Sequence, residues 1–110
     1  MPTRTVSREG LHAELATDMS EARLQAHIVK VARDLGWWVY HTYDSRRNRP
    51  GFPDLFLARD RILYRECKTE KGRLSAEQKR VHAQLRRAGG DVAVWRPSDY
   101  YSGLIERELR

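Results

Sequence analysis

The sequence predicts an α/β fold with a small sheet between helices, in the order helix, three strands, helix, strand, followed by a C-terminal helix. Three patterns predict it: an amphipathic helix near the start, two apolar stretches around a polar turn, and a second helix followed by a continuous apolar stretch. A chain of 110 residues holds one hydrophobic core. We therefore expect a tail over residues 1–17 and a single domain over residues 18–110.

The first predicted helix follows the tail, within which only a short helix near Leu11–Leu15 is expected. Asp18 or Ser20 can cap its N-terminus, and Asp18 precedes Glu21 by the three residues of a capping box. Gly36 is predicted to end the helix, because glycine readily adopts the left-handed conformation of a C-terminal cap. The apolar stripe of this helix consists of Leu24, Ile28, Val31 and Leu35.

Three strands are predicted next, from runs of β-branched, aromatic and aliphatic residues. The first covers residues 37–43, and a polar loop punctuated by glycine and proline follows over residues 44–53. The second and third strands, 54–58 and 62–68, flank the polar turn 59–61. This arrangement predicts a β-hairpin.

The remaining segments are predicted to be a loop over 69–74, a helix, a strand and a last helix. Ser75 and Gln78 have the spacing of a capping box that opens the helix, and Gly89-Gly90 ends it. Residues 92–95 are continuously apolar, which is typical of an internal strand. Pro97 is expected to end this strand, Ser98 or Asp99 to cap the last helix, and Leu104, Ile105 and Leu109 to form the buried side of that helix.

Charge and composition favour a nucleic-acid partner. The formal net charge is +6, and most of the 21 basic residues are arginines, whose guanidinium groups match phosphate oxygens. No stretch approaches the ~20 apolar residues that span a bilayer, so we expect no membrane partner and a cytoplasmic location. A single cysteine, Cys67, excludes an internal disulfide and a cysteine-cluster zinc site.

The segment Glu66-Cys67-Lys68 at the end of the third strand is the first candidate for chemistry. Because alternate side chains of a strand share a face, Glu66 and Lys68 point together and Cys67 points into the core. The place of Asp54 depends on the hairpin register. A two-residue turn would set apolar against charged residues, whereas the three-residue turn 59–61 pairs Phe56 with Tyr64 and brings Asp54 opposite Glu66.

Two carboxylates on one face suit Mg²⁺ or Mn²⁺ with water and a backbone carbonyl, and they do not suit zinc. The alternative is a structural cluster of ion pairs on a solvated edge of the sheet, because the pattern D…ExK is short. The glycine–proline turn into the hairpin, the basic loop before it and the flanking helices favour the metal site.

Taken together, these residues resemble the VRR-NUC family of the PD-(D/E)XK nuclease superfamily. The resemblance covers about residues 20 to 95 and includes the order of helices and strands. It is carried by Gly51-Phe52-Pro53-Asp54, Glu66-Cys67-Lys68 and Gln78, and extends to Glu21, Gln25, Gly36-Trp37, His41, Ser45-Arg46, Gly72 and Ser75.

The resemblance implies a role for each matching residue. Asp54 and Glu66 would hold the metal with the backbone carbonyl of Cys67, and Lys68 would position the attacking water. Glu21 would reach the metal from the first helix, although a glutamate there is also favoured by the helix dipole. Gln78 would be an active-site residue, although the capping box explains it equally well.

A second group of residues is expected to contact DNA. The basic loop before Asp54 and the loop after Lys68 both adjoin the candidate site, although solvated loops are commonly charged. His41 is expected either to contact DNA or to be satisfied by its neighbours. The expected DNA-binding residues are His41, Ser45, Arg46, Arg47, Arg49, Lys71 and Arg73. The tryptophans Trp37, Trp38 and Trp95 are expected to be mainly core, with one of them exposed at a partner surface.

The resemblance implies a Mg²⁺- or Mn²⁺-dependent DNA endonuclease, structure-selective on branched DNA such as four-way junctions or flaps. It also implies a homodimer, in a bacterial or phage-infected host cell. Dimerisation has a physical motive as well, because the small core leaves the aromatic and last-helix surfaces in need of cover. The alternatives are a non-specific or restriction-type nicking nuclease, and a catalytically inert nucleic-acid-binding module on the same fold.

Overall fold

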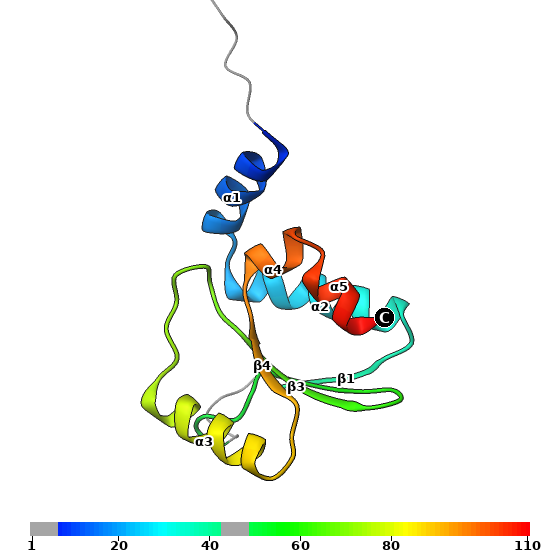
Figure 1. Ribbon diagram of the computed structural model, residues 1–110, viewed down its shortest axis with the longest axis vertical. Helices are drawn as coiled ribbons and strands as arrows, with labels where there is room; N and C mark the ends of the chain where they lie inside the picture. The colour runs from blue at the N-terminus through cyan, green and yellow to red at the C-terminus, as the bar shows by residue number, and fades with distance from the viewer. Residues whose placement is uncertain (1–6, 43–48) are drawn as a thin grey trace, which may run out of the picture.

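The computed structural model of the chain describes residues 7–42 and 49–110 (Figure 1). Its elements in chain order are α1 (Arg8–Asp18), α2 (Glu21–Asp34), β1 (Trp38–His41), β2 (Leu55–Ala58), β3 (Ile62–Cys67), α3 (Ala76–Arg87), β4 (Val92–Trp95), α4 (Pro97–Tyr101) and α5 (Leu104–Leu109). From α2 onward the predicted order of helices and strands is confirmed, with one difference at the C-terminal end.

Among the described residues, the sheet has four strands in the order β1-β2-β3-β4, with β4 parallel to β3 and the other pairs antiparallel. In the hairpin, Phe56 pairs with Tyr64 and Ala58 pairs with Ile62. The turn is therefore the three-residue segment 59–61, as the apolar pairing predicted. Residues 92–95 form an edge strand and not the expected internal one; their apolar side chains are explained by helices on both faces of the sheet.

Helices cover both faces of the sheet, with α2, α4 and α5 on one side and α3 on the other (Figure 1). The main core lies on the α2 side, because β2 and β3 direct their odd-numbered side chains there. Its buried residues include Leu24, Ile28, Ala32, Leu55, Leu57, Leu63, Cys67, Trp95, Ile105 and Leu109. The even-numbered side chains of the hairpin face the α3 side, where the candidate site lies.

The N-terminal helices differ in detail from the expected ones. Ser20 caps α2, and its hydroxyl oxygen accepts a hydrogen bond from the Arg23 amide at 3.1 Å. Asp18 is not the cap, because it is the last residue of α1. This helix is longer than the expected Leu11–Leu15 turn: it packs on α4 and stacks the His12 ring on that of a tyrosine.

The last helix was expected to be continuous, but it is split into α4 and α5. Gly103 adopts a positive φ of 85° between them, a conformation that glycine permits at little steric cost. The N-cap of α4 is Arg96 and not Ser98 or Asp99, because Pro97 with its fixed φ occupies the first helical position. Asp99 nevertheless supports this N-terminus by accepting a hydrogen bond from the Arg96 amide at 2.8 Å.

The three tryptophans divide as expected. Trp37 and Trp95 are buried, whereas Trp38 is 61% exposed. None of the helices formed by residues 7–42 and 49–110 has the length and apolar character needed to cross a membrane.

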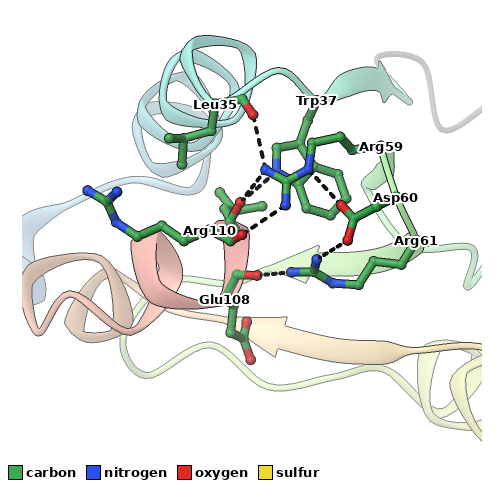
Figure 2. Close-up of polar contacts among 8 residues, drawn as sticks. Leu35, Trp37, Arg59, Asp60, Arg61, Glu108 and Arg110 are labelled. Atoms are coloured by element: carbon green, nitrogen blue, oxygen red, sulfur yellow. Dashed lines mark hydrogen bonds and ion pairs between the residues drawn. The ribbon is translucent and has the colours of Figure 1, made fainter.

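Two arginines of the hairpin turn bind the C-terminal ends of helices (Figure 2). The Arg59 guanidinium donates to the carbonyl oxygens of Leu35 at 3.1 Å, Leu109 at 3.0 Å and Arg110 at 2.9 Å. Arg61 donates to the carbonyl oxygen of Glu108. We call Arg59 and Arg61 the arginine clamp, because they satisfy carbonyl groups that have no partner within the helices.

The arginine clamp also covers Trp37. The Arg59 and Arg61 guanidinium carbons lie 4.6 Å and 4.9 Å from the centre of its ring, and the indole N–H donates to the Leu109 carbonyl at 2.8 Å. These cation–π contacts and hydrogen bonds join the hairpin to both α2 and α5. The far end of the hairpin is therefore fixed to the body of the protein.

We expect Arg59→Ala to lower the free energy of unfolding by about 2–3 kcal/mol, because it leaves several carbonyl groups without their charged donor. Arg59→Lys should restore little of this loss, since one ammonium group cannot reach three carbonyls. Urea unfolding measures the effect. Lys30→Ala, which removes only an exposed i,i+4 ion pair with Asp34, is the control and should cost about 0.5 kcal/mol or less. Equal losses in the two alanine variants would contradict the clamp.

Candidate active site

The segment that leads into Asp54 is held closely against α3. Gly51 has a φ of 92°, and a Cβ there would lie 2.6 Å from the carbonyl oxygen of Glu77. Only glycine fits this approach. Pro53 is buried, and the Thr42 amide donates to the Asp54 carbonyl at 3.0 Å. The Gly-x-Pro-Asp turn thus delivers Asp54 to the start of β2 in one orientation.

Asp54 and Glu66 lie together, as the hairpin register predicted. The Asp54 amide donates to a Glu66 carboxylate oxygen at 3.1 Å. The Asp54 carboxylate in turn accepts a hydrogen bond from the Cys67 amide at 2.9 Å. Asp54 precedes the paired residues of β2, so these two bonds replace regular strand pairing at this point. The two carboxylates therefore share one site at the end of the hairpin.

Glu66 is an unusual residue in this position, because its side chain is buried with 1% of the residue exposed. Chiefly burial raises its pKa to about 9; the side-chain contact with Asp54 and the negative charge of Asp54 act in the same direction, whereas the hydrogen bond from the Asp54 amide opposes them. The positive charge of Lys68 opposes this shift. Two adjacent carboxyl groups in a poorly solvated site cannot both ionise without a nearby cation.

Lys68 follows Glu66 by two residues and is partly buried. Its amide donates to the Trp95 carbonyl at 3.1 Å, which continues the pairing of β3 with β4. The loop after it is held by Arg96, whose guanidinium donates to the carbonyls of Thr69 and Gly72, both at 2.7 Å. The lysine thus stands on a backbone fixed on both sides, beside the carboxylate pair.

Gln78 forms the predicted capping box and also contacts Glu66 of the candidate site. Its side-chain oxygen accepts a hydrogen bond from the Ser75 amide at 2.9 Å, and the Ser75 hydroxyl oxygen accepts one from the Gln78 amide at 3.1 Å. This is the predicted capping box. The Gln78 side-chain nitrogen also donates to Glu66 Oε1. One side chain therefore joins the N-terminus of α3 to the buried carboxyl group.

Glu21 lies on the first turn of α2 and is exposed. Within the described residues, no cluster of three His, Cys, Asp or Glu side chains forms a candidate metal site, so Glu21 does not join Asp54 and Glu66. Its negative charge does reach the buried Cys67 thiol and contributes to raising that group's pKa, behind burial and the two site carboxylates. Cys67 is a core residue, as expected.

His41 is held by Gln25 of α2, because its Nε2 is hydrogen-bonded to the Gln25 side-chain oxygen. Burial lowers the pKa of His41, and the charge of Asp54 partly opposes this effect. A pocket of about 590 Å³ between α2 and β1 is lined by both residues, and also by Lys30 and Arg33. The histidine thus borders the candidate site and belongs to a contact between α2 and β1.

The predicted DNA-binding residues are placed only in part. Arg49, Lys71 and Arg73 are exposed on the loops that enter and leave the site. Ser45, Arg46 and Arg47 lie outside the described residues. Two neighbours of the site were not predicted from the sequence: Arg96, and His82 on α3. His82 is fully buried, its ring nitrogens have no hydrogen-bond partner among the described residues, and burial lowers its pKa.

The residues present fit a divalent cation. Asp54 and Glu66 offer oxygen ligands, which Mg²⁺ and Mn²⁺ prefer, and the raised pKa of Glu66 reflects how poorly the pair is neutralised by protein groups alone. A ligating cation would favour the ionised form of Glu66. Within the described chain, neither a sulfur nor a histidine ligand set accompanies the pair.

The four-stranded mixed sheet, with a carboxylate pair and a lysine at the end of its hairpin, defines a nuclease of the PD-(D/E)XK type. Comparison with known proteins identifies the family. The VRR-NUC domain model matches residues 2–99, and the chain belongs to the VRR-NUC family. A solved structure described as a VRR_NUC domain is 29% identical, with a TM-score of 0.66 over 78% of this chain and 94% of that one. No curated protein matches the chain. The protein is thus a hydrolytic nuclease, with DNA as its substrate.

The raised pKa of Glu66 has a consequence for stability. Without a divalent cation, folded Glu66 keeps its proton up to about pH 9, whereas an unfolded glutamate releases it near the ordinary value of 4.5. The folded state therefore binds more protons between these values, and the contribution of Glu66 to stability falls as pH rises.

We expect Glu66→Gln to remove this loss, because glutamine does not ionise. The free energy of unfolding of the variant, relative to that of the original chain, should be higher at about pH 8 than at about pH 5. At about pH 5 residue 66 is uncharged in the folded state of both proteins. Urea unfolding in the presence of a chelator measures it. A stability difference that is constant across this range would show that Glu66 titrates normally.

Gln78→Ala and Ser75→Ala separate the two roles of Gln78. Both variants should lose about 1 kcal/mol of stability, because each breaks the capping box of α3. Only Gln78→Ala removes the donor to Glu66, so only this variant should change the affinity for Mn²⁺ measured by calorimetry. The same change of affinity in Ser75→Ala would assign the effect to fraying of the helix.

Proposed function

We propose that the protein is a Mg²⁺- or Mn²⁺-dependent DNA endonuclease that acts on branched DNA as a homodimer. The observation that carries the proposal is the contact between Asp54 and Glu66, with Lys68 directly after β3 and its positive charge acting on Glu66. Two carboxylates beside a phosphate are repulsive by themselves, so a protein that only binds DNA gains nothing from them. They are useful when a cation lies between them and the phosphate.

Asp54 and Glu66 would bind the cation, with the Cys67 backbone carbonyl as a further ligand and Glu21 reaching it through water. A Mg²⁺ ion held by these residues would supply positive charge beside the scissile phosphate and would lower the pKa of bound water. Gln78 orients Glu66 through their hydrogen bond. The cap on α3 therefore also serves to fix the direction of a ligand.

Lys68 would hold the attacking water and stabilise the negative charge that develops on the phosphate oxygens. The water oxygen forms a bond to phosphorus, and the bond from phosphorus to the 3′ oxygen breaks. The attacking water gives up a proton and the leaving oxygen takes one up, so the products are a 3′-hydroxyl and a 5′-phosphate. Lys68 is suited to this role because its backbone is fixed between β4 and the loop held by Arg96.

The proposal of DNA as the substrate is supported by charge. A net charge of +6, with Arg49, Lys71 and Arg73 exposed around the site, attracts the DNA backbone without selecting a sequence. A second copy could cover Leu11 and Leu15, the exposed leucines of α1. The last-helix residues Ile105 and Leu109 are already buried within one chain.

We expect Lys68→Ala to lower the rate of DNA cleavage in Mg²⁺ by about 100- to 1,000-fold, because it removes a charge aimed at the transition state. DNA binding measured in Ca²⁺ should change by less than tenfold. Lys79→Ala, which removes an equal charge from an exposed position of α3, is the matched control and should cleave normally. Binding without any cleavage by the unaltered chain would instead support an inert binding module.

The preferred substrate is tested with labelled DNA of four kinds: a four-way junction, a flap, a plain duplex and a single strand. Faster cleavage of the junction or flap supports the proposal, whereas equal cleavage of all four indicates a non-specific nicking nuclease. Sedimentation of the same sample tests the homodimer, whose mass would be twice the 12.9 kDa of the chain. A single species of 12.9 kDa under the assay conditions would contradict the dimer.

A further inference from the structure

A group of aromatic side chains lies on the α3 side of the sheet. Trp38 and Tyr40 of β1 have nearly parallel rings, with centres 6.4 Å apart and planes at 17°. Phe56 of β2 contacts Trp38 at 6.0 Å and Tyr64 of β3 at 5.3 Å. Phe52, in the turn before Asp54, contacts Tyr64 at 6.1 Å. We call these five residues the aromatic surface.

The aromatic surface is on the same sheet face as the carboxylate pair. Side chains of a strand alternate between faces, so Phe56 is on the side of Asp54 and Tyr64 is on the side of Glu66. Phe56 is two positions from Asp54, and Tyr64 is two positions from Glu66. This spacing corresponds to about 7 Å along the strand. Tyr40 pairs with Phe56 across β1 and β2, and Phe56 pairs with Tyr64 across β2 and β3. The three rings therefore form a row across the sheet, next to the row that contains Asp54 and Glu66.

The part of this surface on β1 is open to solvent. Trp38 is 61% exposed and Tyr40 is 49% exposed, and β1 is at the edge of the sheet among the described strands. The helix α3 lies over the other end of the same face, where Gln78 reaches Glu66 and Gly90 approaches the Tyr64 ring. Large exposed aromatic side chains beside a functional site are typical of a binding surface.

We propose that the aromatic surface stacks with unpaired nucleobases of the DNA strand whose phosphate lies at Asp54, Glu66 and Lys68. The proposal rests on the nuclease function proposed above and names the feature of the substrate that is recognised. The polyanion is attracted by the net charge of +6, and the rings extend from the site across the same face of the sheet. Aromatic rings bind bases of any sequence, because every base has a π-face.

Stacking of this kind would distinguish branched DNA from a plain duplex. In a duplex each base is covered by its neighbours, whereas the bases at a junction, flap or gap can be exposed. A binding surface for exposed bases next to the cleavage site would therefore favour cleavage near the branch. No contact to base edges is needed for this selectivity.

The test uses Trp38, because the other two tryptophans are buried and the exposed one reports on the surface. Three variants are compared: Trp38→Leu, which keeps apolar volume without a π-face, Trp38→Phe, which keeps a ring, and Ile62→Ala, which removes an exposed apolar side chain of the same face. The probe is a labelled oligothymidylate in Ca²⁺, with a duplex of equal length as the second probe.

We expect Trp38→Leu to weaken oligothymidylate binding by about 5- to 150-fold, as loss of one stacked base does, and to weaken duplex binding less. Trp38→Phe should retain most of the affinity, and Ile62→Ala should change it by less than about twofold. Equal affinity in Trp38→Leu and the unaltered chain would overturn the proposal. So would a change of oligomeric state in Trp38→Leu, which would make the surface an interface between copies of this chain.

Failure of the base-stacking proposal is distinguishable from failure of the nuclease proposal. Cleavage in Mg²⁺ with binding unaffected by Trp38→Leu would retain the nuclease and reject base stacking. Binding that depends on Trp38 without cleavage by the unaltered chain would retain base stacking as a mode of binding and reject the nuclease.

Discussion

The register of β2 against β3 is the constraint on which the candidate site depends. A shift by one residue would turn Glu66 into the core and move Leu57 or Leu63 to the α3 side. The structure fixes this register at both ends of the hairpin. The arginine clamp holds the turn against α2 and α5, and the Asp54 carboxylate binds the Cys67 amide where regular pairing ends. Positioning of the two carboxylates is therefore a property of the whole hairpin and not of the two residues alone.

The buried pair of Glu66 and Asp54 is unfavourable for stability, and apolar packing on the other face of the hairpin compensates for it. Burying Glu66 beside Asp54 opposes ionisation, and an ionised, unpaired carboxylate in such a site would lower stability further. The surrounding structure offsets the cost, because Leu55, Leu57 and Leu63 on the other face of the same hairpin are fully or almost fully buried. One strand pair thus has a stabilising apolar face and a face with the candidate site, so that a domain of this size can hold a buried carboxyl pair.

Much of the fold could be predicted from the sequence, because it depends on local patterns. Apolar pairing alone selected the three-residue turn, and alternation alone put Glu66 and Lys68 on one face. The family resemblance then identified the nuclease. What could not be predicted depends on contacts between distant residues: the clamp of Arg59 on the C-terminal carbonyls, the loop held by Arg96, and the break at Gly103. The double role of Gln78 was visible only as two alternatives, since the sequence gives no sign that one amide group can serve both.

The bond from Gln78 to Glu66 has a consequence for the dynamics of the protein. The first turn of α3 is closed by the same side chain that holds the buried carboxyl group, so local fraying of this turn and ionisation of Glu66 are linked equilibria. A cation that stabilises the ionised form of Glu66 therefore also stabilises the first turn of α3. Fraying of this turn, conversely, breaks the hydrogen bond to the Glu66 carboxyl group. Amide hydrogen exchange at the start of α3 would therefore report the state of a site that lies on a different element of the fold.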